Sequence, residues 1–367
     1  MDKKEIVNLF MNKGLLLTPS ALSFLEEKSN DIIELLSEKK YEKDILTEAD
    51  FRLPSIIILK NITQIPREIT TEDFISYYTD KYEKMKAIIT ERIKKDFISL
   101  NKIDNFRNEV YVIGIVKEIK QKDDKTIVEI EDLTTSVPII FEEKVECELD
   151  DVIAVHAVSA KNIMFGKKII YPDVPIRQPT KGFGSACFIS DLHLDEAPIK
   201  DFLVFVDWFN QQKIDYLFVA GDIGDLKAFE EAVKNIHTKT FVIPGNADDK
   251  EYPGLPLEFS SKNIVSLSNP SVIEVNGIKV LIIHDKNDVM TMLKKRHLGK
   301  PTRIFSKDYL VLDIVPDIVH YGHTHEPFVT NHKAVTFVNS GSLLSSFKPV
   351  VINFENRNVE QINFKAE

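Results

Sequence analysis

An apolar run ends abruptly in two aspartates in the segment YLFVAGDIGD, which occupies residues 216–225. A run of this kind is typical of a strand that crosses a core and delivers polar side chains at its carboxyl end. The same arrangement occurs in SACFISDLH, residues 185–193, and in TFVIPGNAD, residues 240–248. Repeated segments of this type predict an α/β layered fold with functional residues along one edge of a sheet.

Three further apolar runs continue the pattern downstream. VLIIH, residues 280–284, ends on His284, and IVHYGHTH, residues 318–325, ends on Gly322, His323, Thr324 and His325. With a last run at 336–339, six strands are predicted: 186–189, 216–219, 240–243, 280–283, 318–321 and 336–339. Five polar clusters therefore follow five predicted strands in chain order.

The side chains of these clusters are imidazoles, carboxylates and an amide, a donor set that suits Mn²⁺, Fe or Zn²⁺. Two cations about 3.5–4 Å apart need a carboxylate that bridges them, and Asp222 is the predicted bridge. The other expected ligands are Asp191, His193 and His325 at one site, and Asn246, His284 and His323 at the other. One Asp-x-His triplet or one histidine alone is more often a surface loop or a core residue, so the prediction depends on all five clusters together.

This set of motifs resembles the calcineurin-like metallophosphoesterase superfamily over about 187–343. The resemblance implies a β-sandwich flanked by helices, two divalent metal ions held by those seven residues, and catalysis by Asp222, Asn246 and His323. Mn²⁺ is the expected metal, with Mg²⁺, Fe and Zn²⁺ as alternatives. Bound metals lower the pKa of water and neutralise charge on the phosphoryl oxygens.

One position departs from the superfamily pattern. Ala247 stands where relatives usually have a histidine that protonates the leaving group. A methyl group cannot donate a proton, and general acid catalysis contributes roughly two to four orders of magnitude in rate. The resemblance therefore implies metal binding with reduced hydrolysis.

The N-terminal half lacks the strand-then-polar pattern. Residues 1–42 predict a small helical region, which is either a docking site for a partner or a simple cap. Residues 43–70 are interrupted by prolines and predict a linker. A helix is expected to begin with Thr71 as its N-cap, and its buried stripe is predicted to consist of Phe74, Tyr78, Met85, Ile89 and Ile93.

Apolar and polar residues then alternate with a period of two. Five short strands are predicted at 111–116, 126–130, 137–141, 152–155 and 168–170. Such a set indicates a small barrel of the oligonucleotide-binding type. The barrel and the preceding helix would form a domain at 71–180, and residues 181–367 would form the phosphoesterase domain.

The bulk composition is that of a folded globular protein. The 367 residues are 43% hydrophobic and 28% charged. With no apolar run long enough to cross a bilayer, we expect no membrane association and a cytoplasmic location. Two cysteines, Cys147 and Cys187, are too few for a disulfide framework and are expected to be buried free thiols. The formal net charge of -10 argues against a broad basic DNA-binding face.

Segments beside the site motifs carry a second resemblance. Residues 268–284, 292–298 and 308–325, together with 69–74, resemble the small-subunit family of archaeal DNA polymerase D. The resemblance implies a 3′–5′ proofreading exonuclease. Its partner would be the large catalytic subunit of polymerase D, and its substrate the single-stranded 3′ end of DNA. A large partner that holds the DNA would account for the acidic charge of this chain.

Two other functions stay open. Ala247 favours a scaffold subunit with little or no catalysis, although all seven expected ligands are present. A free-standing phosphodiesterase for small nucleotides is the other alternative, but it needs neither barrel nor helical N-terminus. Arg296 and His297 are expected either to contact the DNA backbone or to form an exposed helix end.

Overall fold

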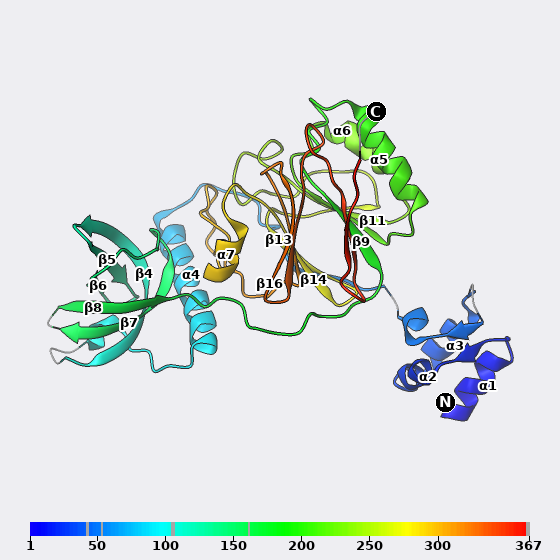
Figure 1. Cartoon of the computed structure of the whole chain (residues 1–367), viewed down its shortest axis with the longest axis horizontal. Helices are drawn as coiled ribbons and strands as arrows, with labels where there is room; N and C mark the ends of the chain where they lie inside the picture. The colour runs from blue at the N-terminus through cyan, green and yellow to red at the C-terminus, as the bar shows by residue number, and fades with distance from the viewer. Residues whose placement is uncertain (42–43, 53, 104–106, 161, 365–367) are drawn as a thin grey trace.

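The computed structural model describes residues 1–41, 44–52, 54–103, 107–160 and 162–364, which form an elongated molecule (Figure 1). A β-barrel with one long helix lies at one end, and a two-sheet sandwich lies in the middle. A small helical unit with the N-terminus lies at the other end. The expected order of a helical region, a barrel and a helix-flanked sandwich is therefore present.

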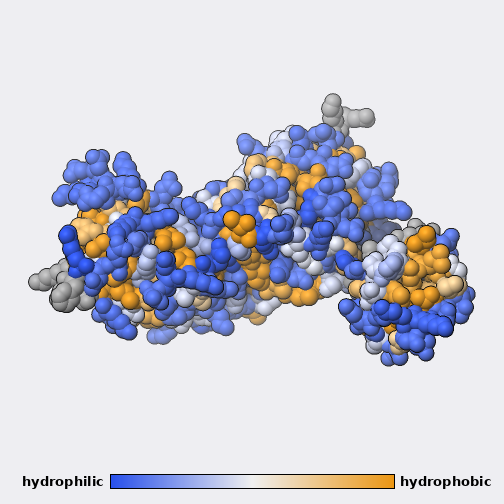
Figure 2. Space-filling model, turned by 60° about the horizontal axis from the view of Figure 1, so that its bottom comes forward, coloured by the Kyte–Doolittle hydropathy of each residue, from blue (hydrophilic) through white to orange (hydrophobic). Residues whose placement is uncertain are grey.

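The N-terminal unit contains three short helices, α1 (Lys3–Met11), α2 (Pro19–Glu26) and α3 (Asn30–Glu38), a parallel pair of strands, β1 (Leu16–Leu17) and β2 (Ile45–Leu46), and the 3-10 helix η1 (Glu48–Phe51). Phe10 and Phe51 pack edge to face at its core, with ring centroids 5.3 Å apart. Figure 2 shows apolar side chains gathered on the surface of this unit, where Leu35 is 65% exposed.

The predicted linker at 43–70 is not a plain connector. Its first part, β2 and η1, belongs to the N-terminal unit. Its middle part forms β3 (Ile56–Lys60), which pairs antiparallel with β13 (Ser271–Val275) of the sandwich. The run Ile56, Ile57, Ile58 has no polar alternation because β3 is an edge strand, and these three side chains are 39–48% exposed.

The barrel is closed by β4 (Glu109–Lys122), β5 (Lys125–Glu131), β6 (Ser136–Phe141), β7 (Val152–Ala160) and β8 (Ile163–Ile170). Its strand order is β4-β5-β6-β8-β7, and β6 and β8 pair in parallel. All five predicted barrel strands lie within these elements. The interior is filled by alternate residues of the strands, including Val128, Ile130 and Phe141.

Helix α4 (Thr71–Arg92) lies between the barrel and the sandwich. Its N-cap is Thr70 rather than the predicted Thr71, because Thr70 and Asp73 form a reciprocal capping box. The predicted buried stripe is partly wrong. Met85 and Ile89 are buried, but Phe74 is 43% exposed, and the inward face instead includes Tyr77, Lys81 and Tyr82.

Two six-stranded sheets form the sandwich. The first has the order β12-β11-β10-β9-β18-β19, with β9 (Ser185–Ile189), β10 (Tyr216–Ala220), β11 (Lys239–Ile243), β12 (Ile264–Ser266), β18 (Val350–Asn353) and β19 (Val359–Gln361). The second has the order β16-β17-β15-β14-β13-β3, with β14 (Ile278–His284), β15 (Ile318–Gly322), β16 (Pro327–His332) and β17 (Val335–Ser340). All six predicted strands of this half lie within these elements.

The sheets pack face to face around an apolar layer that includes Phe188, Phe218, Phe241 and Ile282. Helices α5 (Ile199–Gln211) and α6 (Leu226–Val233) cover the outer face of the first sheet, and α7 (Val289–Lys295) covers the second. Strands β9, β10 and β11 run parallel to one another, as do β14, β15 and β17. Their carboxyl ends therefore deliver polar residues to one edge of the sandwich.

Cys187 is buried and Cys147 is partly buried, and both are free thiols. Within the described residues, no helix combines the length and the apolar character needed to cross a bilayer.

Candidate metal centre

The loops that follow five strands converge on one place. Asp191 comes two residues after β9, Asp222 two residues after β10, and Asn246 three residues after β11. His284 is the last residue of β14, and His323 and His325 follow β15 directly. The structure thus brings together all seven residues that the sequence predicts as ligands, and their donor atoms fall into two groups that share Asp222.

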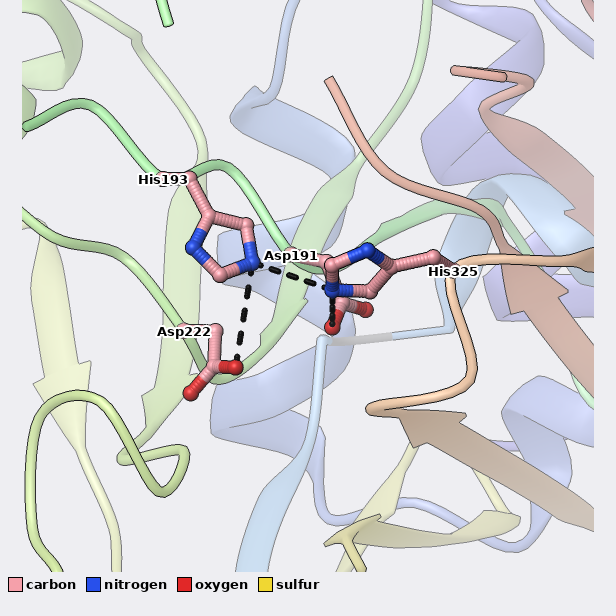
Figure 3. A group of neighbouring side chains, drawn as sticks. All are labelled: Asp191, His193, Asp222 and His325. Atoms are coloured by element: carbon pink, nitrogen blue, oxygen red, sulfur yellow. Dashed lines mark hydrogen bonds and ion pairs between the residues drawn. The ribbon is translucent and has the colours of Figure 1, made fainter. Parts of the chain in front are cut away.

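The first group contains Asp191, His193, Asp222 and His325, one ligand atom of each lying within 4.8 Å of the others. Figure 3 shows the two imidazole rings pointing toward each other above the two carboxylates, with the Nε2 atoms of His193 and His325 3.1 Å apart. Oδ1 of Asp191 lies 3.4 Å from Nε2 of His325. Asp191 is fully buried and His325 is partly exposed, so the group is open on one side.

The second group contains Asp222, His284 and His323, also within 4.8 Å of one another. Nε2 of His284 lies 3.3 Å from Oδ2 of Asp222. The side-chain oxygen of Asn246 joins this group, at 2.7 Å from Nδ1 of His323 and 3.2 Å from Nε2 of His284. Asp222 therefore lies between the groups, as a bridging carboxylate must.

Backbone contacts fix the orientation of His284. Its Nδ1–H donates to the carbonyl oxygen of Ala220 at 2.8 Å, which turns Nε2 toward Asp222. Asn269 holds the main chain at the same residue, because its amide accepts from the His284 N–H at 3.0 Å and donates to the His284 carbonyl at 2.8 Å. This Asn269 contact was not predicted, since nothing in the local sequence connects residues 269 and 284.

Asp248 holds two of the ligand loops together. Its carboxylate accepts backbone N–H groups from Ile223, Gly224 and Gly245, at 3.1, 3.2 and 2.8 Å. One side chain thereby links the loop that carries Asp222 to the loop that carries Asn246. Asp248 belongs to one of the polar clusters in the sequence, but no role was predicted for it. The sequence pattern does not distinguish an aspartate that holds loops together from one that binds a metal.

The ligand loops are held in an uncommon backbone conformation. Asp191, His193, Asp222, His323 and His325 all have positive φ angles, between 45° and 89°. Non-glycine residues rarely adopt this region, and each such residue costs of order 1–3 kcal/mol. Five of the seven expected ligands share this strain, which indicates that the surrounding fold has been shaped around their side-chain directions.

Glycine is required where these loops pass closest to one another. A Cβ atom on Gly245 would lie 2.2 Å from the backbone nitrogen of Asp222, and one on Gly322 would lie 2.4 Å from the carbonyl oxygen of Ala220. Either substitution would push two ligand loops apart. The predicted mechanical role of these glycines therefore matches the close approach of backbone to backbone.

The buried carboxylates of the centre favour the binding of positive charge. Burial opposes ionisation of Asp222, but the hydrogen bond and charge of His284 outweigh it and lower the pKa of Asp222 to about 2. Burial likewise opposes protonation of His284, yet Asp222 and Asp191 raise its pKa to about 9. Carboxylates that hold a proton on a buried imidazole provide the environment that a divalent cation needs, so the residues fit the expected metals.

Ala247 contributes its backbone and not its side chain. Its N–H donates to Oδ1 of Asp222 at 2.8 Å, while the residue itself is exposed. The main chain at this position orients the central carboxylate. The methyl group offers neither a proton nor a hydrogen bond to a substrate, as the sequence predicted.

A cavity of about 790 Å³ lies beside the second group. Asn246, His284 and His323 line it from the sandwich, Lys81 lines it from α4, and residues 148–151 line it from the barrel. The candidate site is therefore not a property of the sandwich alone. Helix α4, the barrel and the sandwich all contribute to its surroundings.

The two alternatives stated for Arg296 are both wrong. Its side chain is buried and donates from Nε to the carbonyl oxygen of Leu312 at 2.7 Å and from Nη2 to that of Asp313 at 3.0 Å. Arg296 is the C-cap of α7 and has a left-handed conformation, with φ of 58°. His297 bonds Asp308 through Nε2 at 2.9 Å and also lines the cavity, so it is not an exposed helix end.

Comparison with known proteins shows similarity to one domain superfamily and to several archaeal proteins. Residues 185–354 match the family model of the calcineurin-like phosphoesterase superfamily domain. The DNA polymerase II small subunit of Methanothermobacter thermautotrophicus is 28% identical, over 81% of this chain and 78% of that protein. The corresponding proteins of Archaeoglobus fulgidus and Thermoplasma acidophilum are 26% and 25% identical, over 90% and 93% of this chain and 83% and 86% of their own lengths. This chain therefore carries a calcineurin-like phosphoesterase superfamily domain and resembles the small subunits of archaeal DNA polymerase II along most of its length.

Proposed function

We propose that this chain is the small subunit of an archaeal DNA polymerase of the D class and that it hydrolyses phosphodiesters at the 3′ end of single-stranded DNA. The observation that carries the proposal is the pair of donor groups that share Asp222. A pair of cations in that arrangement is the recurring device of phosphodiester hydrolysis. The similarity to polymerase II small subunits over most of the chain supports DNA as the substrate.

Two divalent cations, with Mn²⁺ as the expected metal, would be held by Asp191, His193, Asp222 and His325 at one site and by Asp222, Asn246, His284 and His323 at the other. When bound, they supply positive charge for the phosphoryl oxygens and lower the pKa of water. The chain contributes the fixed placement of these donors. Strained loops, the Asp248 clamp and the Asn269 contact hold them before a substrate arrives.

Asn246 and His323 line the cavity in which a substrate would lie, and Asp222 lies behind them. Asn246 is exposed and lines the cavity, and its oxygen is engaged by His284 and His323, which leaves its amide N–H₂ to donate to a phosphoryl oxygen. His323 also lines the cavity, with its Nδ1 next to the side-chain oxygen of Asn246. Asp222 is shared by the two donor groups and so fixes their positions relative to each other. Protonation of the leaving oxygen falls to solvent, because Ala247 has no proton to give.

The partner of the chain would be the large catalytic polymerase subunit. A formal net charge of -10 gives this chain little long-range attraction for DNA, so a second protein would have to hold the duplex. The small subunit would then receive only a frayed end. The N-terminal unit, with its exposed apolar residues, and the barrel are the surfaces available for such docking.

The proposal is tested with the purified full-length chain, stripped of metal and reloaded with Mn²⁺. Single-stranded DNA labelled at the 5′ end should shorten one nucleotide at a time from its 3′ end, and Asp222→Ala should abolish the reaction. A matched control is Asp225→Ala, which removes the N-cap of α6 and is not one of the seven expected ligands. Equal digestion by the parent and Asp222→Ala would show that the centre does not catalyse hydrolysis.

Ala247 supports a second candidate, a scaffold subunit whose centre binds metal but hydrolyses little. It predicts two bound metals and no digestion, with or without the large subunit. A free-standing nucleotide phosphodiesterase would digest small nucleotides and would not copurify with a large polymerase subunit. Metal content, digestion and copurification together separate the three functions.

A further inference from the structure

Lys81 of α4 is a buried cation that points into the cavity beside the candidate metal centre. The residue is 4% exposed, and it lies on the inward face of the helix together with Tyr77 and Tyr82. It lines the same cavity as Asn246 and His284. No described residue forms a hydrogen bond or an ion pair with the ammonium group of Lys81. A buried charge without a direct partner is costly to the fold.

Two of the three carboxylates whose charges act on Lys81 are committed to other groups. Asp308 accepts from Nε2 of His297 at 2.9 Å and from the backbone N–H of Leu310 at 2.6 Å. Asp151 accepts from Lys295 and from the hydroxyl of Tyr171, each at 3.0 Å. Burial lowers the pKa of Lys81, although the charges of Asp308, Asp150 and Asp151 oppose this shift. Lys81 is thus kept near negative charge without being neutralised by a contact.

The rest of the cavity has the same imbalance of partners. Three exposed lysines line it, Lys250, Lys286 and Lys300, and no ion pair to them exists within the described part of the chain. Some of the acidic residues of the lining do have cationic partners. Lys295 pairs with Glu148 at 3.1 Å, and Arg303 pairs with Asp249 at 2.8 Å. Asp150, Glu251, Asp285 and Asp288 of the lining have no ion pair within the described residues. Lys81 and the three exposed lysines are the groups of the lining that can meet an anionic ligand.

We propose that Lys81 binds a backbone phosphate of the single strand whose terminal phosphodiester lies at the metal centre. This inference rests on the proposed function and names the part of the chain, outside the phosphoesterase domain, that holds the substrate. A volume of about 790 Å³ is large for one phosphate and suits a short length of strand. The strand would pass between α4 and the sandwich, with Lys81 at the buried side and the exposed lysines at the mouth.

Binding of a single-stranded phosphorothioate decanucleotide, measured by fluorescence anisotropy with Mn²⁺ present, tests the proposal on the full-length chain. Lys81→Met keeps the length of the side chain and removes its charge. It should raise Kd about tenfold and reduce the slope of log K against log salt by about 0.7, the value for one phosphate contact on a single strand. Lys81→Arg should restore most of the affinity.

Lys86→Met is the matched control, because Lys86 lies on the same helix, over the ring of Tyr82, and does not line the cavity. It should leave Kd and the salt slope unchanged. Lys300 is exposed and lines the cavity, and Lys300→Ala should raise Kd two- to threefold. This variant provides the test of strand binding in the cavity if Lys81→Met has a lower melting temperature than the parent. Undetectable binding by the parent, or a Kd and a salt slope of Lys81→Met equal to those of the parent, overturns the inference.

The same variants separate this inference from the proposed function. Hydrolysis of bis(p-nitrophenyl) phosphate with Mn²⁺ depends on the metal centre and not on a strand. Lys81→Met should leave its rate unchanged while KM for an oligonucleotide rises and kcat stays constant. If the parent hydrolyses neither substrate but loses affinity with Lys81→Met, hydrolysis is refuted and strand binding stands.

Discussion

The backbone N–H of Ala247 donates to Oδ1 of Asp222 at 2.8 Å, so the residue that lacks the usual acid still orients the central carboxylate. This bond does not depend on the side chain. A substitution at position 247 can therefore change the proton supply without moving the centre.

Ala247→His should accelerate hydrolysis of single-stranded DNA by about ten- to a hundredfold. The imidazole would supply a general acid at an exposed position beside the substrate, and such an acid is worth roughly 10²–10⁴ in rate when it is well placed. The measurement is kcat at saturating Mn²⁺, with metal content determined in parallel. An unchanged kcat at equal metal content would mean that another group already protonates the leaving oxygen.

Asp248→Ala should weaken Mn²⁺ binding about ten- to a hundredfold, because outer-sphere residues that orient metal ligands have effects of this size. It leaves three backbone N–H groups without their acceptor, at a cost of about 2–4 kcal/mol in the free energy of unfolding. Isothermal titration and chemical denaturation measure the two effects. Asp225→Ala, which removes only the N-cap of α6, should cost about 1 kcal/mol and leave metal affinity intact. Equal Mn²⁺ affinities of Asp248→Ala and Asp225→Ala would show that Asp248 does not orient the metal ligands.

Mn²⁺ should stabilise the folded chain. A ligand at a hundred times its Kd adds about 2.7 kcal/mol to the free energy of unfolding. The melting temperature should rise on addition of Mn²⁺ and fall again with a chelator. In Asp222→Ala the rise should disappear, because both donor groups lose their shared member. A full rise in that variant would place the bound metal elsewhere.

His320 should make the protein sensitive to mild acid. It is fully buried in the sandwich, edge to face with Phe188 at 5.1 Å between centroids. Burial, with a smaller effect from the charge of His284, lowers the pKa of His320 to about 3. The ordinary pKa of about 6.5 applies to the unfolded chain, which therefore takes up a proton first as the pH falls. The stability contributed by this residue is complete above pH 6.5 and is lost progressively toward pH 3.

His320→Leu should remove this loss. Between pH 7.5 and pH 5.0 the metal-free parent should lose about 2 kcal/mol more than the variant, since each pH unit below 6.5 costs about 1.4 kcal/mol. Urea denaturation at the two pH values measures the difference. Parallel losses in the parent and the variant would show that His320 is not held neutral.

The strands of the sandwich could be predicted because each is a buried apolar run that stops at a polar cluster. The runs before Asp191, Asp222 and His284 show this directly. Parallel strands bring their carboxyl ends to one edge, so the meeting of the clusters followed from the order of the segments. Ala247 could be identified in the same way, because its position is fixed by Gly245 and Asn246.

Other features could not be predicted because they depend on contacts between distant segments. Lys81 lies on the inward face of α4, where apolar periodicity alone assigns Phe74 instead. Its charge alone assigns Arg296 to the surface, but the side chain is buried and donates to the carbonyl oxygens of Leu312 and Asp313. The pairing of β3 with β13 joins segments more than two hundred residues apart, and no local pattern encodes it.

The central claim is that one carboxylate, Asp222, bridges two cations held by six other side chains. Anomalous scattering at the manganese edge from crystals of the full-length chain grown with Mn²⁺ tests it most directly. We expect two peaks, both within bonding distance of Asp222, one next to His193 and His325 and the other next to His284 and His323. A single peak, or peaks that Asp222 does not touch, would contradict it.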